Sequence, residues 1–463
     1  MLGATAVAPG AATAAPAPAP ARFADFNNDG YPDLAVSAAT APAGTVSRAG
    51  AVAVAYGSPS GLRYDNASIV NQGTPGVPGD PVDNGQWRAV TDFGDLDHDG
   101  YDDLVIRWGD AGTVLWGSAA GITGAGVPVA SGTITDGVPQ LLGRLAVGDV
   151  NGDGIDDLVS RGWDTGASSG LVDGVAVLLG PLNHTTGQPA GRWWRNTEKL
   201  DNLQTYGVNV GDLTGDGIAD IAVAGGVVGA STMAWMVLKG SPSGPVKGSA
   251  WNGPYGTDWP HPTAVGDINR DGYADVVEGY PFTSRFYVIY GGPAGISATL
   301  PPRLYTQASP GVPGVDEKDD KFGSAVAIGD TDRDGYPDLV VGTSYETGSD
   351  PATTWRSGAV TVLRGSAGGL TTTGAKVLTQ NSSGIPSTSE REDHFGAAVE
   401  IIDSDRNGTA EVYVGGNGED GYRGRIWKLQ TGATGVTGTG ATSFQLGDLG
   451  GPTGGNFGAY LVG

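Results

Sequence analysis

Residues 25–34 read Asp-Phe-Asn-Asn-Asp-Gly-Tyr-Pro-Asp-Leu, with acidic or amide side chains at positions 1, 3, 5 and 9 and glycine at position 6. The same frame, closed by an apolar residue, begins again at Asp95, Asp149, Asp212, Asp267, Asp330 and Asp403. The copies are 54 to 73 residues apart, and each interval is long enough for four short strands and their loops. The sequence therefore predicts seven structural repeats.

Each nine-residue loop carries hard oxygen ligands of the kind that calcium prefers. Oxygens at positions 1, 3 and 5 point inward along a tight turn, glycine at 6 permits the bend, the carbonyl of 7 turns in, and an acid at 9 closes the cage. We therefore expect up to seven Ca²⁺ ions. The expected ligand residues are Asp25, Asn27, Asp29, Tyr31, Asp33, Asp95, Asp97, Asp99, Tyr101, Asp103, Asp149, Asn151, Asp153, Ile155, Asp157, Asp212, Thr214, Asp216, Ile218, Asp220, Asp267, Asn269, Asp271, Tyr273, Asp275, Asp330, Asp332, Asp334, Tyr336, Asp338, Asp403, Asp405, Asn407, Thr409 and Glu411.

The loops differ in the quality of their ligands. The second and sixth loops place four carboxylates at positions 1, 3, 5 and 9, whereas the first, third and fifth have asparagine at position 3. The fourth loop has Thr214 at that position, which predicts weaker binding. The seventh loop has Asn407 at position 5 and the longer Glu411 at position 9, so its geometry is expected to differ.

Two alternatives compete with the calcium interpretation. A single Asp-x-Asn-x-Asp-Gly stretch usually forms an Asx-turn without any metal, and the first nine residues of an EF-hand loop have similar spacing. An EF-hand closes with an acid at position 12 and needs flanking helices, however, and here strand patterns flank the loop. The ligand positions hold 23 of the 50 acidic residues. Such clustering is costly without a cation, which favours metal binding.

The segments around the loops are typical of strands. Residues 322–329 alternate before the sixth loop, residues 338–342 follow it as a β-branched run, and residues 358–365 form a further alternating run that ends in glycine. In five repeats a glycine-bounded turn follows this last run, as in residues 57–61; repeats three and seven lack the turn. The expected order in each repeat is strand, metal loop, strand, strand, turn, strand.

Together these parts resemble the FG-GAP repeat of integrin α-subunit heads and their bacterial relatives. The shared features are Phe-Gly before the loop, the Asp-x-Asn/Asp-x-Asp-Gly-x-x-Asp-Leu loop itself, and a Gly-x-Val-x-Val strand after it. The resemblance covers nearly the whole chain after residue 21, although repeats two to five lack Phe-Gly. It implies an all-β, seven-bladed β-propeller with calcium in loops between the first two strands of its blades.

The two ends of the sequence complement one another. The repeat begins almost at a loop, at residues 22–25, and ends with residues 456–463, which read as a first strand without its loop. We therefore expect residues 22–463 to form a single propeller whose ring is closed by both ends, because closure removes exposed sheet edges. Residues 1–21 are rich in Ala and Pro and are interpreted as a leader remnant or a disordered tail.

Composition restricts the classes of partner. With 50 acidic against 26 basic residues, the chain would be repelled by nucleic acid and by anionic membranes. No stretch of 18 apolar residues is present, so no membrane span is expected. Without cysteine, thiol chemistry and disulfides are excluded. Residues 166–170 match a nucleophile-elbow pattern but lack the helix that should follow, and the four histidines lack zinc-motif spacing.

The predicted function is a secreted or surface-associated, monomeric calcium-binding module for adhesion to a protein or a carbohydrate. Its ligand is expected on the face opposite the metal loops, where several aromatic residues gather, although packing between blades would also explain each ring. These residues are Trp163, Trp251, Tyr255, Trp259, His261, Tyr280, Phe282, Tyr345, Trp355 and Tyr422. The alternative is an extracellular hydrolase or lyase with catalytic residues on that same face.

Overall fold

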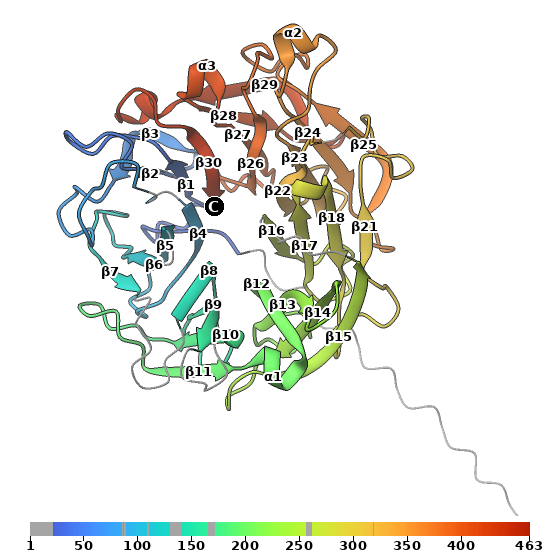
Figure 1. Ribbon diagram of the computed structural model, residues 1–463. Helices are drawn as coiled ribbons and strands as arrows, with labels where there is room; N and C mark the ends of the chain where they lie inside the picture. The colour runs from blue at the N-terminus through green and yellow to red at the C-terminus, as the bar shows by residue number, and fades with distance from the viewer. Residues whose placement is uncertain are drawn as a thin grey trace, which may run out of the picture.

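The computed structural model is a ring of seven antiparallel four-stranded sheets arranged like blades around a central axis (Figure 1). It describes residues 22–463 except 86, 88, 109–110, 130–139, 165–171, 256–261 and 318. The proposed leader, residues 1–21, lies outside the described residues. The seven-bladed β-propeller predicted from the repeats is confirmed.

The blades follow one another along the chain, and in six of them the strands lie in the sheet in sequence order; in blade one the innermost strand comes from the C-terminal end of the chain. Blades one to three contain β1 (Leu34–Ala38), β2 (Ala51–Tyr56), β3 (Arg63–Val70), β4 (Ala89–Gly94), β5 (Asp103–Trp108), β6 (Ala111–Leu115), β7 (Gly126–Val129), β8 (Gln140–Gly148), β9 (Asp157–Asp164), β10 (Val172–Leu179) and β11 (Gly191–Arg195). Blades four and five contain β12 (Leu203–Gly211), β13 (Asp220–Val227), β14 (Thr232–Lys239), β15 (Val246–Tyr255), β16 (Thr263–Gly266), β17 (Asp275–Tyr280), β18 (Arg285–Ile289) and β21 (Arg303–Tyr305).

The remaining elements complete the ring and its connections. Blades six and seven contain β22 (Phe322–Gly329), β23 (Asp338–Thr343), β24 (Ala359–Arg364), β25 (Thr371–Leu378), β26 (Phe395–Ile402), β27 (Glu411–Gly416), β28 (Arg425–Gln430) and β29 (Thr437–Phe444). The last strand is β30 (Phe457–Val462). Short elements between strands are β19 (Gly291–Gly292), β20 (Gly295–Ile296), α1 (Thr197–Asp201), α2 (Pro351–Thr354), α3 (Glu419–Tyr422) and the 3-10 turns η1 (Pro281–Thr283) and η2 (Leu446–Leu449).

Each blade starts at the centre of the ring and ends at its rim. In blade six, β22 leads into the nine-residue loop, and β23 returns antiparallel with Gly329 opposite Asp338. Every residue of β23 is buried, as its β-branched sequence predicts, whereas β25 at the rim is mostly half-exposed or exposed. The predicted order of strand, loop, strand, strand, turn, strand is therefore confirmed, and all seven loops lie on one face of the ring.

The Phe-Gly pairs have a structural role at the start of the innermost strands. Phe322, Phe395 and Phe457 are fully buried between blades. The glycine after each has a left-handed backbone, with φ of 86° to 88°, and makes a register shift in the sheet of blades six and seven. In the neighbouring strand, a Cβ on Gly342 would lie 2.0 Å from the carbonyl oxygen of Gly396, so glycine is required where blades six and seven meet.

The two ends of the chain meet in blade one. Strand β30 pairs antiparallel with β1, with Ala35 opposite Val462 and Ala38 opposite Phe457, and supplies the innermost strand of that blade (Figure 1). The predicted ring closure is confirmed. Within the described part of the chain, no helix is long and apolar enough to cross a membrane.

Candidate metal centres

The seven acidic loops are neighbours on one face, and hydrogen bonds join several neighbouring pairs. The backbone N–H of Ala219 in the fourth loop donates to the carbonyl of Asp149 in the third, and Ala274 in the fifth donates to Asp212 in the fourth. The Arg406 guanidinium of the seventh loop donates to the carbonyl of Gly30 in the first, at 2.6 Å. Neighbouring loops therefore hold one another in place.

Each loop is bent around its own acidic side chains. In the first loop, Asp25 accepts the N–H groups of Asp29 and Gly30 at 3.0 and 2.8 Å, one on each carboxylate oxygen. Asp29 in turn accepts the N–H of Tyr31 at 3.0 Å. Gly30 has φ of 88°, the left-handed conformation that glycine adopts without strain. The predicted tight turn with glycine at position 6 is thus formed by the residues that were expected to bind the metal.

The acid at position 9 is the most deeply buried of the expected ligands. Asp33 is fully buried and accepts the N–H of Phe26 at 2.8 Å and that of Gly57, after the third strand, at 2.9 Å. The same pair of bonds recurs at Asp103, Asp157, Asp275 and Asp338. The ninth position therefore fixes the loop to the turn that follows the third strand. Each turn also rests on the loop of the preceding blade, as when Leu182 donates to the carbonyl of Leu96.

Burial changes the protonation of these acids. It raises the pKa of Asp33 to about 8 and that of Asp103 to about 9, and the neighbouring acids of each loop act in the same direction. Both values exceed the unfolded value of about 3.9. A cation among the carboxylates would favour their ionised form, so metal binding and deprotonation are coupled.

This coupling predicts that calcium binding releases protons. At pH 7 the metal-free protein holds protons on Asp33 and Asp103, which a bound cation would expel; above pH 9 the release should disappear. Calorimetry in buffers of different ionisation enthalpy measures the proton count, and Asp103→Asn should reduce it. The metal-free protein should also lose stability progressively as pH rises from about 4, the unfolded pKa, to the folded pKa values of about 8 and 9, because the folded state alone keeps these protons in that range. Calcium binding at pH 7 without proton release would contradict this prediction.

Two loops bring three carboxylates together most closely. Carboxylate oxygens of Asp95, Asp97 and Asp103 lie within 4.8 Å of one another, as do those of Asp330, Asp332 and Asp338. These are the second and sixth loops, which the sequence identified as richest in acids. The oxygen-only donor set and the buried, unpaired Oδ1 of Asp97 both suit a hard cation such as calcium. In the sixth loop the Arg364 guanidinium also contacts Asp332.

The fourth and seventh loops depart from the common geometry. In the fourth loop, the N–H of Thr214 at position 3 donates to Asp220 at position 9. In the first loop the corresponding donor is the residue at position 2. In the seventh, Lys428 places its ammonium 2.8 Å from Glu411, and both side chains are largely buried. The amino group of Lys428 already neutralises the closing acid. These differences fall on the two loops that the sequence singled out.

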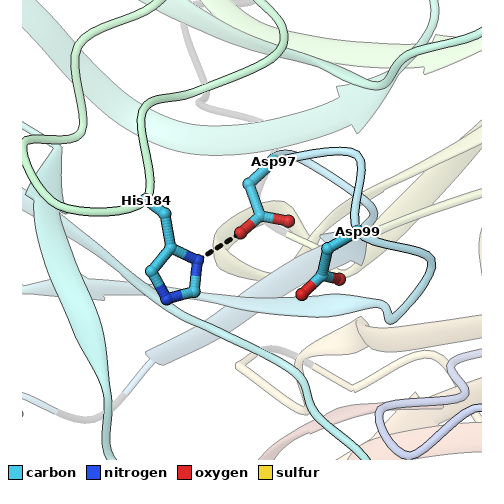
Figure 2. A group of neighbouring side chains, drawn as sticks. All are labelled: Asp97, Asp99 and His184. Atoms are coloured by element: carbon cyan, nitrogen blue, oxygen red, sulfur yellow. Dashed lines mark hydrogen bonds and ion pairs between the residues drawn. The ribbon is translucent and has the colours of Figure 1, made fainter.

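One residue beside the second loop was not identified from the sequence. His184 lies in the turn that replaces the glycine-bounded turn of repeat three, and its Nδ1 is 2.5 Å from Asp97 (Figure 2). The imidazole of His184 and the carboxylates of Asp97 and Asp99 each offer an atom within 4.8 Å of the others. The sequence signal that could have identified His184 is the absence of the glycine-bounded turn in repeat three. That signal points to the second loop only when the contact between blades two and three is known.

The aromatic residues expected on the opposite face divide into two groups. Tyr280 is fully buried and donates to Glu278, so it packs inside blade five and is not part of a binding surface. Phe282 and Tyr422 are 64% and 48% exposed. Trp251 is half-buried against Trp235. Trp259, His261 and the side chains of Trp163 and Tyr255 lie outside the described residues, as does the elbow-like stretch 166–170.

The fold and loops define a class: a seven-bladed propeller with an acidic loop after the innermost strand of each blade. Residues 22–55 and 322–363 match the FG-GAP repeat, and residues 212–278 match the FG-GAP-like repeat. The chain thus contains FG-GAP repeats and is similar to integrin α subunits.

Similarity to individual proteins covers parts of the chain. Human integrin alpha-6 is 33% identical over 154 residues, which cover 33% of this chain and 12% of that protein. Bovine phosphatidylinositol-glycan-specific phospholipase D is 39% identical over 111 residues, covering 22% of this chain and 12% of that protein. The chain thus spans a small fraction of the length of these relatives. A solved Dos1 propeller, 9% identical, covers 84% of this chain and 77% of its own, with a TM-score of 0.39.

Proposed function

We propose that this protein is a calcium-stabilised binding module, secreted or held at a cell surface, that adheres to an extracellular protein or carbohydrate. The acidic loops serve as structural cation sites on one face. The ligand surface lies on the other face, at the strand ends farthest from the loops. Integrin α-like FG-GAP repeats support the assignment of an adhesive role.

The observation that carries this proposal is a cluster of rings and cations on the face opposite the loops. We call it the aromatic–basic patch; it consists of Phe282, Lys321, Tyr345, Trp355, Arg356, Arg391, His394 and Tyr422. Lys321 Nζ lies 3.7 Å from the centre of the Tyr345 ring, and the Arg356 guanidinium lies 4.2 Å from the same ring. Arg356 and Arg391 lie 4.1 and 4.4 Å from the Trp355 ring. Such contacts orient cations and rings that would otherwise be mobile.

The backbone under the patch is held in an uncommon conformation. Lys321, Arg356, His394 and Tyr422 all have positive φ, between 56° and 67°. A left-handed backbone at a residue other than glycine costs of the order of 1–3 kcal/mol, and such residues cluster where ligands bind. The same left-handed conformation also occurs in the acidic loops, as at Asn28 and His98. In the patch it fixes the backbone of four residues, which supports the proposal of a preorganised binding surface.

The position of the patch also suits a ligand. It borders the mouth of the central cavity, whose volume is about 1750 Å³ and whose lining includes Phe282, Lys321, Tyr345 and Tyr422. Exposed aromatic rings beside cations provide both apolar contact and charge, the combination that is enriched in binding hot spots. The patch gathers three cationic side chains on a chain whose net charge is −24. Glu392, 3.0 Å from His394, is an acid beside these cations.

The ligand surface can be tested with a panel of immobilised glycans and extracellular proteins, probed in millimolar calcium and in chelator. The double variant Phe282→Ala, Tyr422→Ala should weaken binding to a panel member at least about tenfold, because both rings are exposed and available for contact. Val246→Ala, an exposed apolar residue on β15 at the end nearer the loops, should bind like the wild type. Binding that survives the double variant, or no binding to any member of the panel, would contradict the proposal.

A further inference from the structure

The second loop has a feature that separates it from the other loops. In the first, third, fifth, sixth and seventh loops, the side-chain oxygen at position 3 accepts the backbone N–H of position 5. In the second loop Asp97 instead directs one carboxylate oxygen to His184 of the next blade. Its other oxygen, Oδ1, is buried without a hydrogen-bond partner, and the side chain is 5% exposed. A buried carboxylate oxygen without a donor is costly unless a cation occupies the vicinity.

His184 is held firmly at this position. Its ring stacks on Trp116 with centroids 4.9 Å apart and planes 17° apart. Trp116 is buried and donates its indole N–H to the backbone carbonyl of His184 at 2.9 Å. The imidazole therefore reaches the second loop from the turn of blade three with little freedom. Such supporting contacts are typical of the partners that orient a metal-binding histidine.

We propose that Asp97, Asp99 and His184 form a transition-metal site of the Zn²⁺ class beside the second loop. Figure 2 shows the three side chains converging from two separate segments of the chain. An imidazole nitrogen suits zinc and its neighbours better than calcium, which takes oxygen ligands. The donor atoms lie within 4.8 Å of one another, more than two bonds of about 2.1 Å can span, so a rotation of the exposed Asp99 side chain toward Asp97 and the stacked imidazole completes the site.

Asp97 links this site to the calcium loop. One of its oxygens faces His184, and the carboxylate also belongs to the group formed with Asp95 and Asp103. A carboxylate can bridge two cations through its two oxygens. Only the sharing of Asp97 between the two cations rests on the proposed function. His184 lies outside the calcium loop.

The test is a calorimetric titration of the full chain with Zn²⁺ in the presence of millimolar calcium, which occupies sites built from oxygen alone. The wild type should bind one Zn²⁺ more tightly than any other, and His184→Ala should weaken that binding at least about tenfold. His98→Asn is the matched control: it removes an exposed histidine at position 4 of the same loop, and asparagine tolerates its φ of 65°. NMR of the imidazole groups should show zinc shifting the signals that disappear in the His184 variant.

The possible results separate this site from the calcium loops. Zinc binding that is unchanged in His184→Ala, or lost in His98→Asn instead, overturns the inference. Calcium binding is measured independently with the same variants and should remain in His184→Ala. Failure of the loops to bind calcium would contradict the proposed function, whereas retention of zinc binding in His184→Ala would contradict the zinc site alone.

Discussion

Removal of divalent cations with a chelator is expected to lower the unfolding midpoint of the whole protein, in one cooperative transition. Cations are expected to bind the folded loops, in which carboxylates from positions 1 to 9 are gathered, and not the unfolded chain. Each site filled at a hundred times its Kd adds about 2.7 kcal/mol to the free energy of unfolding. Because hydrogen bonds connect the loops to the loops or turns of the next blade, loss at several sites should destabilise all blades together. Differential scanning calorimetry with calcium and with chelator measures the shift.

A matched pair of variants assigns the effect to the loops. Asp334→Ala removes the exposed position 5 carboxylate of the sixth loop, one of the two with four acids, and should reduce the calcium-dependent shift. Asn407→Ala removes the corresponding residue of the seventh loop, where Lys428 already neutralises Glu411, and should reduce it less. Identical unfolding curves in calcium and in chelator would rule out stabilisation by these loops.

Opening the ring at β30 should have the other large effect. Deletion of residues 456–463 removes the innermost strand of blade one and leaves β1 with an unpaired edge. It also exposes the cluster in which Phe457 packs with Phe444 and Tyr413. We expect the shortened chain to aggregate, or to unfold far below the midpoint of the full chain, as followed by circular dichroism and light scattering.

Point variants separate packing from closure. Phe457 is fully buried, so Phe457→Ala should cost about 3–5 kcal/mol in the free energy of unfolding. Tyr460 lies on the same strand and is 45% exposed, so Tyr460→Ala should change it by no more than about 0.5 kcal/mol. If the deletion variant unfolded at the same midpoint as the full-length chain, closure through β30 would contribute nothing to stability.

The fold was accessible from the sequence because its information is local and repeated. The frame of Asp25 to Asp33 contains its own glycine, its own turn and its own acids, and the β-branched run after it marks the second strand. Seven copies make the period of the ring visible. The Phe-Gly pairs were recognised as a signature, but their reason, a left-handed glycine that lets β22 and β26 bulge beside a buried phenylalanine, appeared in the tertiary structure.

Contacts between blades were not accessible from the sequence. Tyr280 and Phe282 are two residues apart, which in a continuous strand would place both on one face. The first is fully buried and the second is 64% exposed, because β17 ends at Tyr280 and Phe282 lies in the turn η1. The aromatic–basic patch joins residues of blades five, six and seven. Its cation–ring contacts depend on the angles at which those blades meet.

By itself, the sequence determined the number of blades, the place of each acidic loop and the closure by β30, because hydrophobic periodicity and turn chemistry act over a few residues. The tertiary structure alone decided what surrounds each loop. His184 lies 87 residues from Asp97 along the chain and 2.5 Å from it in space, and Lys428 reaches Glu411 across the sheet of blade seven. Such neighbours are set by the packing of one strand or blade against the next, which leaves no regular spacing in the sequence.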